Sequence, residues 1–77
     1  MTTFEKLVEI FQEVFEEELD VTKVTPEARL VEDLEMKSIG MLYMAMAVEQ
    51  EFDIKFVNED FETLRTVQDI IDKIERG

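Results

Sequence analysis

Hydrophobic residues recur at helical spacing near the start of the chain, at Phe4, Leu7, Val8, Phe11, Val14 and Phe15. Positions three and four apart lie on one face of a helix, so this pattern predicts an amphipathic helix. Thr2 and Glu5 form a capping box, in which each side chain accepts a hydrogen bond from a free backbone N–H at the helix start. We therefore expect a first helix from Thr2 to about Glu17.

The helical periodicity is lost between Glu18 and Met36, and Pro26 within this stretch favours a turn. Unstructured loops of this length are uncommon in compact domains and often have a function. Isolated apolar residues are expected to anchor this one, at Val21, Val24, Leu30, Val31 and Leu34. The segment therefore predicts a long, anchored loop.

A second helix is predicted over residues 38–52, where Ser38 is a favourable N-cap and the Ala and Met content opposes a strand. From Ile39 to Val48 this helix is apolar on almost every side. A helix of that kind is normally covered by neighbours on several sides. We therefore expect it at the centre of a bundle.

The stretch over residues 53–57 could be mistaken for a strand, but it has no second strand with which to pair. It is expected to be an extended loop. Asn58 is a suitable cap for a short helix that reaches about Thr63. This short helix would follow the loop directly.

The last helix is predicted to begin at Thr66 and Asp69, which form a second capping pair. Its apolar face follows at helical spacing, at Val67, Ile70, Ile71 and Ile74. The whole pattern predicts one all-α domain over residues 1–77, a small bundle of three main helices plus one short helix, with a long loop between the first two.

Composition narrows the chemistry that such a domain can perform. With 77 residues, 45% of them hydrophobic, the chain can form one small core, although a net charge of −12 opposes compaction. It has no cysteine and no histidine, which removes disulfides, thiolate nucleophiles, the usual zinc ligands and the commonest general base. We therefore do not expect an enzyme.

The negative charge also constrains the partners. A polyanion repels nucleic acid and anionic lipid surfaces, and it is attracted to proteins with Lys and Arg patches. The first residues lack the basic start and the apolar run of a signal peptide, and no apolar run is long enough to span a membrane. We therefore expect a cytoplasmic monomer with basic protein partners, no nucleic acid and no membrane span.

An almost uncharged stretch, Met36–Val48, interrupts this acidic chain and contains its only serine, Ser38. Without histidine, this serine cannot be an ordinary triad nucleophile. Two roles remain, a helix cap and a modified residue, since the free N–H groups and the dipole at a helix start stabilise a phosphate ester. Taken without context, the residues favour the cap.

Neither of two metal sites fits the sequence. An EF-hand needs oxygen ligands and a glycine, whereas the acidic stretch at residues 51–60 has apolar residues at ligand positions and no glycine. Methionines can bind copper(I), but methionines at helical spacing without cysteine or histidine are typical of core packing. We therefore predict no metal site.

The stretch LVEDLEMKSIGMLYMAMAVEQEFDIKF, residues 30–56, resembles the signature of acyl carrier proteins. That signature has an acidic pair and a leucine, three further residues, a modified serine, an apolar helix and an acidic exit ending in Phe-Asp-Ile. The segments VTPEARLVEDL, NEDFETL and TVQDIIDKI also follow the family's order. The resemblance therefore covers essentially the whole chain.

This resemblance implies a carrier protein with a covalent cofactor. Ser38 would bear 4′-phosphopantetheine, transferred from coenzyme A by a phosphopantetheinyl transferase. Apart from the resemblance, we hypothesise that Lys37, which stands where the family usually has Asp, pairs with the phosphate of this group. The thiol of this arm would hold acyl groups as thioesters. Acyl-transferring or acyl-activating enzymes of lipid, polyketide or specialised acyl metabolism, such as fatty acid biosynthesis, would be the partners.

The chain departs from the family at the serine, since Lys37 and Ile39 replace the usual Asp and Leu, and Glu35 stands where Gly is typical. Gly40 and Tyr43 also replace common acids. These changes weaken attraction to basic docking patches and add apolar contact, which favours a specialised carrier with its own partners. The docking surface is expected at Leu34, Ile39, Gly40, Met41, Leu42 and Tyr43.

In the family, an acyl chain can fold back into an apolar cleft, and the matching positions here are Met41, Val48, Phe56, Phe61 and Leu64. Because Phe56 and Phe61 are large, we expect them to narrow the cleft and to shelter long chains poorly. The alternative to a carrier is an unmodified acidic adaptor that binds a partner through the methionine-rich helix, with Ser38 as a cap.

Overall fold

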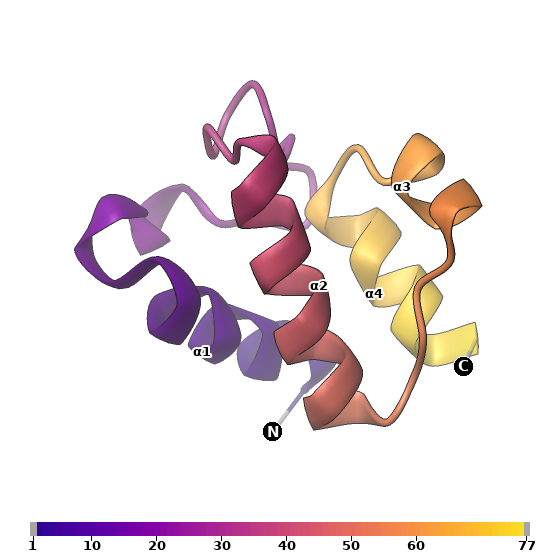
Figure 1. Cartoon of the computed structure of the whole chain (residues 1–77). Helices are drawn as coiled ribbons and strands as arrows, with labels where there is room; N and C mark the ends of the chain where they lie inside the picture. The colour runs from indigo at the N-terminus through magenta and orange to yellow at the C-terminus, as the bar shows by residue number, and fades with distance from the viewer. Residues whose placement is uncertain (1, 77) are drawn as a thin grey trace.

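The computed structural model describes residues 2–76, apart from the side chain of Glu17. Within this range it contains four α-helices and no strand, and α2 lies between α1 on one side and α3 and α4 on the other (Figure 1). The helices are α1 (Thr3–Phe15), α2 (Ser38–Phe52), α3 (Asn58–Thr63) and α4 (Val67–Arg76). The predicted all-α bundle of three main helices plus one short helix is confirmed.

The capping box predicted at the start of α1 is present. The N–H of Glu5 donates to the Thr2 hydroxyl at 3.1 Å, and the N–H of Thr2 donates to the Glu5 carboxylate at 3.0 Å. α1 ends at Phe15, close to the expected end, and a single 3₁₀ turn follows, η1 (Glu16–Glu18). The amphipathic pattern and its cap therefore predicted this helix correctly.

The segment between α1 and α2 is an anchored loop, as expected, with one further 3₁₀ turn, η2 (Val21–Lys23). Leu30 is fully buried and Leu34 is 6% exposed, so both serve as anchors. Val31 does not, because its side chain is 58% exposed. In this turn the side chains of Leu30 and Leu34 face the core, whereas that of Val31 faces solvent.

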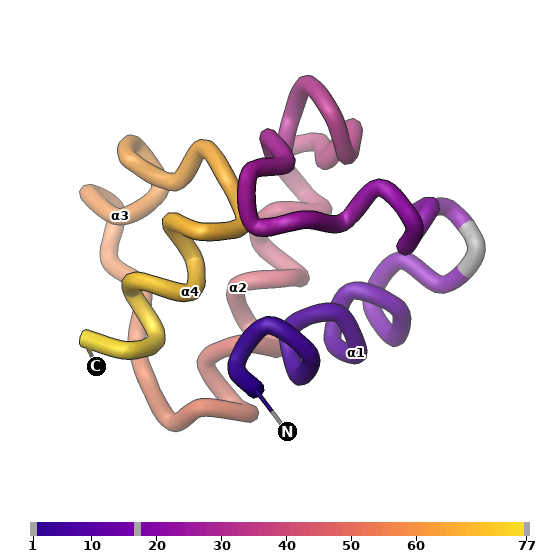
Figure 2. The backbone as a smooth tube through the Cα atoms, turned by 180° about the vertical axis from the view of Figure 1, so that it is seen from behind, coloured from indigo at the N-terminus to yellow at the C-terminus, as the bar shows by residue number. Residues whose placement is uncertain are grey.

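Backbone hydrogen bonds connect this loop to the start of α4. Arg29 and Thr66 form an isolated antiparallel bridge. Beside it, the N–H of Leu30 donates to the Arg65 carbonyl at 2.8 Å, and the N–H of Val67 donates to the Ala28 carbonyl at 3.0 Å. The loop thus reaches the start of α4 and fixes the backbone that leads into α2 (Figure 2).

α2 crosses the middle of the molecule with neighbours on two sides, in line with the expected central position, and one further side stays exposed (Figure 1). Met44 and Val48 have no exposed surface, whereas Leu42 is 54% and Met46 is 56% exposed. α1 and the α3–α4 side cover two flanks of the helix and leave a third open (Figure 1). The bundle is too small to enclose an apolar helix completely.

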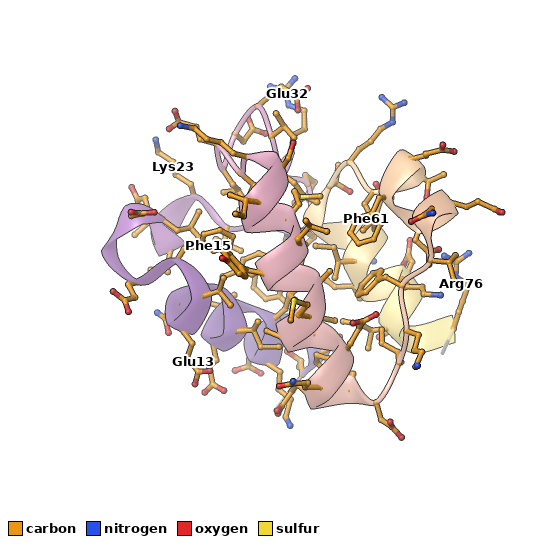
Figure 3. All side chains as sticks on the ribbon, in the orientation of Figure 1. Glu13, Phe15, Lys23, Glu32, Phe61 and Arg76 are labelled. Atoms are coloured by element: carbon orange, nitrogen blue, oxygen red, sulfur yellow. The ribbon has the colours of Figure 1, made fainter. Side chains whose placement is uncertain are left out.

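Gly40 allows α2 to pass close to the end of α1. A Cβ atom at this position would lie 2.9 Å from Cε1 of Phe15. Figure 3 shows the Phe15 ring directed from α1 toward α2. The ring thus occupies the space that a side chain on residue 40 would need.

Residues 54–57 form the predicted loop without a partner strand, whereas Asp53 is the left-handed C-cap of α2 (φ 53°). The expected cap of α3 is wrong. Asn58 is the first residue of α3, and Val57 occupies the cap position. The N–H of Val57 donates to the Asp60 carboxylate at 2.8 Å. A carboxylate inside the first turn therefore satisfies the N–H group that lies at the helix start.

The capping pair predicted for α4 is confirmed. The N–H of Thr66 donates to the Asp69 carboxylate at 3.0 Å, and the N–H of Asp69 donates to the Thr66 hydroxyl at 3.2 Å. Burial raises the pKa of Asp69, but N–H donors from Arg65 and Thr66 outweigh it, so this pKa lies below its usual value. Behind this cap, Val67 and Ile70 are fully buried in the core.

Candidate functional site

Ser38 is the first residue of α2, and its side chain is exposed. The prediction that it caps the helix is wrong, because Lys37 occupies the cap position and makes no side-chain capping bond. The first helical bond runs from the Met41 N–H to the Lys37 carbonyl at 2.9 Å. The N–H groups of the three preceding residues, 38–40, therefore have no partner within the helix.

Lys37 places a cation directly beside Ser38. Its side chain is exposed, and none of the ion pairs between described residues involves it. It is also the only charged residue between Met36 and Val48. A cation, a helix start and an exposed hydroxyl together suit a phosphate ester on Ser38.

An apolar hollow of about 660 Å³ opens next to Ser38, between α2 and α3. We call it the Ser38 hollow, and it is lined by Val31, Met36, Lys37, Ser38, Met41, Leu42, Phe61 and Leu64. Figure 3 shows Phe61 directed from α3 toward α2. The hollow therefore begins at the serine and continues along apolar side chains.

The Ser38 hollow contains only part of the predicted acyl cleft. Met41, Phe61 and Leu64 line it, but Val48 is fully buried in the core and does not. Phe56 lies next to Phe61, with the ring centroids 5.9 Å apart, and is not among the lining residues. The two rings thus pack against each other, and only Phe61 faces the hollow.

Four large apolar side chains form an exposed row on α2, which we call the apolar stripe. Its members are Ile39 (60% exposed), Leu42 (54%), Tyr43 (56%) and Met46 (56%). Their spacing of three, four and seven residues places them on one face of the helix. Exposed apolar groups gathered on one face are typical of an interaction surface.

The stripe differs from the docking surface predicted from the sequence. Leu34 is 6% exposed and belongs to the core, and Gly40 packs against Phe15, so neither offers a side chain to a partner. Met41 is half-buried and lines the Ser38 hollow. Met46 was missed, although its position seven residues after Ile39 is the signal that could have identified it.

A family model described as "Phosphopantetheine attachment site" matches residues 5–74. This match covers most of the chain and defines a class of small carrier domains. An acyl carrier protein of Helicobacter hepaticus is 35% identical over 75 residues, which cover 97% of this chain and 96% of that protein. An acyl carrier protein of Syntrophobacter fumaroxidans is 39% identical over 59 residues, which cover 77% of this chain and 73% of that protein. An acyl carrier protein of Thermosynechococcus vestitus is 43% identical over 56 residues, which cover 73% of this chain and 69% of that protein.

The chain therefore belongs to the acyl carrier protein family, whose members are carriers and not enzymes. The family's cofactor is 4′-phosphopantetheine, a group that is bound covalently to the protein. Among residues 2–76, no helix is long and apolar enough to cross a membrane.

The residues around Ser38 fit this group. Its phosphate requires a free hydroxyl for attachment and donors for its oxygens, which Ser38, the unpaired N–H groups of α2 and Lys37 supply. An acyl chain on its arm is sheltered by apolar surface within reach of the serine, which the Ser38 hollow supplies.

Proposed function

We propose that Ser38 is the attachment point of 4′-phosphopantetheine and that the chain carries acyl groups as thioesters on this arm. The observation that supports the proposal most directly is the exposed Ser38 hydroxyl at a helix start, where the helix does not use it as a cap. When bound, the group supplies a flexible thiol, which a chain without cysteine does not have.

In this proposal the protein's own residues hold the phosphate and shelter the cargo. Lys37 and the N–H groups at the start of α2 stabilise the phosphodiester. The Ser38 hollow receives the first part of the acyl chain, and the contact between Phe56 and Phe61 limits its depth. Long acyl chains are therefore sheltered poorly.

The apolar stripe is proposed as the surface that meets partner enzymes. In an acidic protein, this surface offers apolar contact and one adjacent cation, Lys37, instead of further acids. Partners that rely on basic patches at this point gain little attraction from it. We infer a specialised carrier that serves its own cytoplasmic enzymes of acyl metabolism, after loading by a phosphopantetheinyl transferase.

The proposal is tested by incubating the protein with coenzyme A and a broad-specificity phosphopantetheinyl transferase and measuring its intact mass. We expect the mass to increase by one phosphopantetheine. Ser38→Ala should show no increase, while Thr25→Ala, which removes an exposed hydroxyl from the loop, should load normally.

A chain that gains no adduct, or a Ser38→Ala variant that still gains one, would contradict the proposal. The apolar stripe would then favour the second candidate function, an unmodified acidic adaptor that binds a partner protein through α2. The stripe needs no modification in order to bind.

A further inference from the structure

α3 is the helix with the least support from the core. It has six residues, none of which is fully buried, whereas α1, α2 and α4 each contribute several buried side chains. Its main apolar contacts are the half-buried Phe61 against Phe56 and the buried Leu64 that follows it. Segments with few buried contacts are held by small free energies and open locally.

Open space lies on both sides of α3. On the side of α2 is the Ser38 hollow, which Phe61 and Leu64 line. On the side of α4 is a polar hollow of about 570 Å³, whose lining includes Asp60, Lys73 and Arg76. α3 is therefore not tightly packed on either of these two sides.

One ion pair crosses to α4 at this point. The Lys73 ammonium lies 3.3 Å from the Asp60 carboxylate, and their side chains are 18% and 20% exposed, which makes this the least exposed of the ion pairs between described residues. The same carboxylate oxygen accepts the Val57 N–H at 2.8 Å. Asp60 thus connects the start of α3 to α4.

We propose that Lys73 is a positioning residue which, through Asp60, keeps α3 and Phe61 close to α2 and thereby limits the length of the acyl chain that the Ser38 hollow accepts. This inference rests on the proposed carrier function. Asp60 directly precedes Phe61 in α3. The position of Asp60 therefore determines how far the Phe61 ring can move away from α2. Because α3 has few other contacts, a single partly buried ion pair is a substantial part of what holds it.

The position of α3 is tested first on the unmodified protein by amide hydrogen exchange. The reporters are the N–H groups of Val57, which bonds the Asp60 carboxylate, and Leu64, which bonds the Asp60 carbonyl at 3.0 Å. Lys73→Met keeps the aliphatic stem and removes the charge. It should accelerate exchange at both amides by roughly three- to fivefold, while amides of α1 and α2 stay unchanged.

Two further variants distinguish the effect of losing the Asp60–Lys73 ion pair from the effect of changing the net charge of the protein. Asp60→Asn should have the same effect as Lys73→Met, although it makes the net charge less negative instead of more negative. Lys6→Met breaks the exposed Lys6–Glu51 pair, 2.9 Å long, and changes the net charge exactly as Lys73→Met does. It should leave the α3 amides unchanged.

The effect on cargo is measured on protein loaded from acetyl-, hexanoyl- or dodecanoyl-coenzyme A, as the rate at which hydroxylamine cleaves the thioester. We expect Lys73→Met to slow cleavage of the dodecanoyl thioester about threefold and to leave the acetyl thioester unchanged. Phe61→Ala, which opens the hollow directly, should slow dodecanoyl cleavage at least as much. Lys6→Met should behave as the unaltered protein.

The outcomes distinguish this inference from the function on which it rests. Unchanged exchange in Lys73→Met overturns the role of the ion pair, whether or not the protein can be loaded. Faster exchange without any change in dodecanoyl cleavage overturns the limit on acyl length. A chain that takes no acyl-phosphopantetheine overturns the carrier proposal and the length limit together, while the exchange result still decides whether Lys73 holds α3.

Discussion

At the scale of single residues, Glu35 has a backbone that suits a different amino acid. Its φ is 56°, in the left-handed region, which costs roughly 1–2 kcal/mol for a residue with a Cβ. Glycine adopts this conformation freely but loses more entropy on folding, about 0.4–1 kcal/mol. We therefore expect Glu35→Gly to raise the free energy of unfolding by up to about 1 kcal/mol, measured by urea denaturation.

Glu35→Ala is the matched control for this change. It also removes the exposed carboxylate but keeps the Cβ, so it should leave the free energy of unfolding within about 0.5 kcal/mol of the unaltered protein. Equal stabilisation by Ala and Gly would show that charge, and not backbone conformation, is responsible.

At the scale of elements, the apolar stripe of α2 can be altered without disturbing the core. Because Tyr43 and Met46 are each 56% exposed, Tyr43→Gln and Met46→Gln should change the free energy of unfolding by no more than about 0.5 kcal/mol. If the stripe meets partners, each change should raise the KM of a phosphopantetheinyl transferase for this protein by roughly tenfold, the effect of about 1.4 kcal/mol. The loading rate, followed by mass, measures this KM.

Val57→Gln provides the comparison, since Val57 is also 56% exposed but precedes α3 and lies outside the stripe. Its KM should match that of the unaltered protein. A loss of the same size in Val57→Gln would mean that any exposed apolar residue matters, and no loss in either stripe variant would exclude the stripe from docking.

At the scale of the whole molecule, 20 acids and 8 bases are confined within 28 × 27 × 20 Å. In about 10 mM salt the Debye length, about 30 Å, exceeds these dimensions, so every carboxylate repels the others. In about 100 mM salt it falls to about 10 Å, and only neighbours interact. We expect the melting temperature to rise by about 4–8 °C between these NaCl concentrations, as calorimetry would measure.

The melting temperature of a less acidic variant, measured at the same NaCl concentrations, tests whether repulsion between carboxylates is the cause. Glu9 and Glu13 are exposed on α1, so Glu9→Gln with Glu13→Gln lowers the repulsion without changing the core. This variant should melt at a higher temperature in low salt and respond less to NaCl. An identical salt response in both proteins would point to an effect of salt unrelated to repulsion.

Local features of this fold were accessible from the sequence because they follow from hydrophobic periodicity and from capping pairs within single helices. The amphipathic faces of α1 and α4 and their capping pairs, Thr2 with Glu5 and Thr66 with Asp69, appear in the structure as predicted. Capping pairs are predictable when both partners lie in the same short segment.

The caps of α2 and α3 were predicted wrongly because several residues compete for each position. Ser38 and Asn58 are favourable caps by type, but the cap position of each helix lies one residue earlier, at Lys37 and Val57. Propensity is a local preference, and the loop packing before each helix decides where its backbone turns. The contact between Gly40 and Phe15 was equally hidden, because it joins residues of two helices.

Because Lys37 and not Ser38 occupies the cap position of α2, the Ser38 hydroxyl can be modified without loss of a capping hydrogen bond. Since the helix makes no use of the Ser38 hydroxyl, esterifying or freeing that oxygen leaves the hydrogen bonds described for the fold intact. If Ser38 bears the arm as proposed, the modified and unmodified states of the serine should therefore share one backbone. An enzyme that installs or removes the arm needs to recognise only the surface of a protein that is already folded, and the same molecule can be recharged repeatedly without refolding.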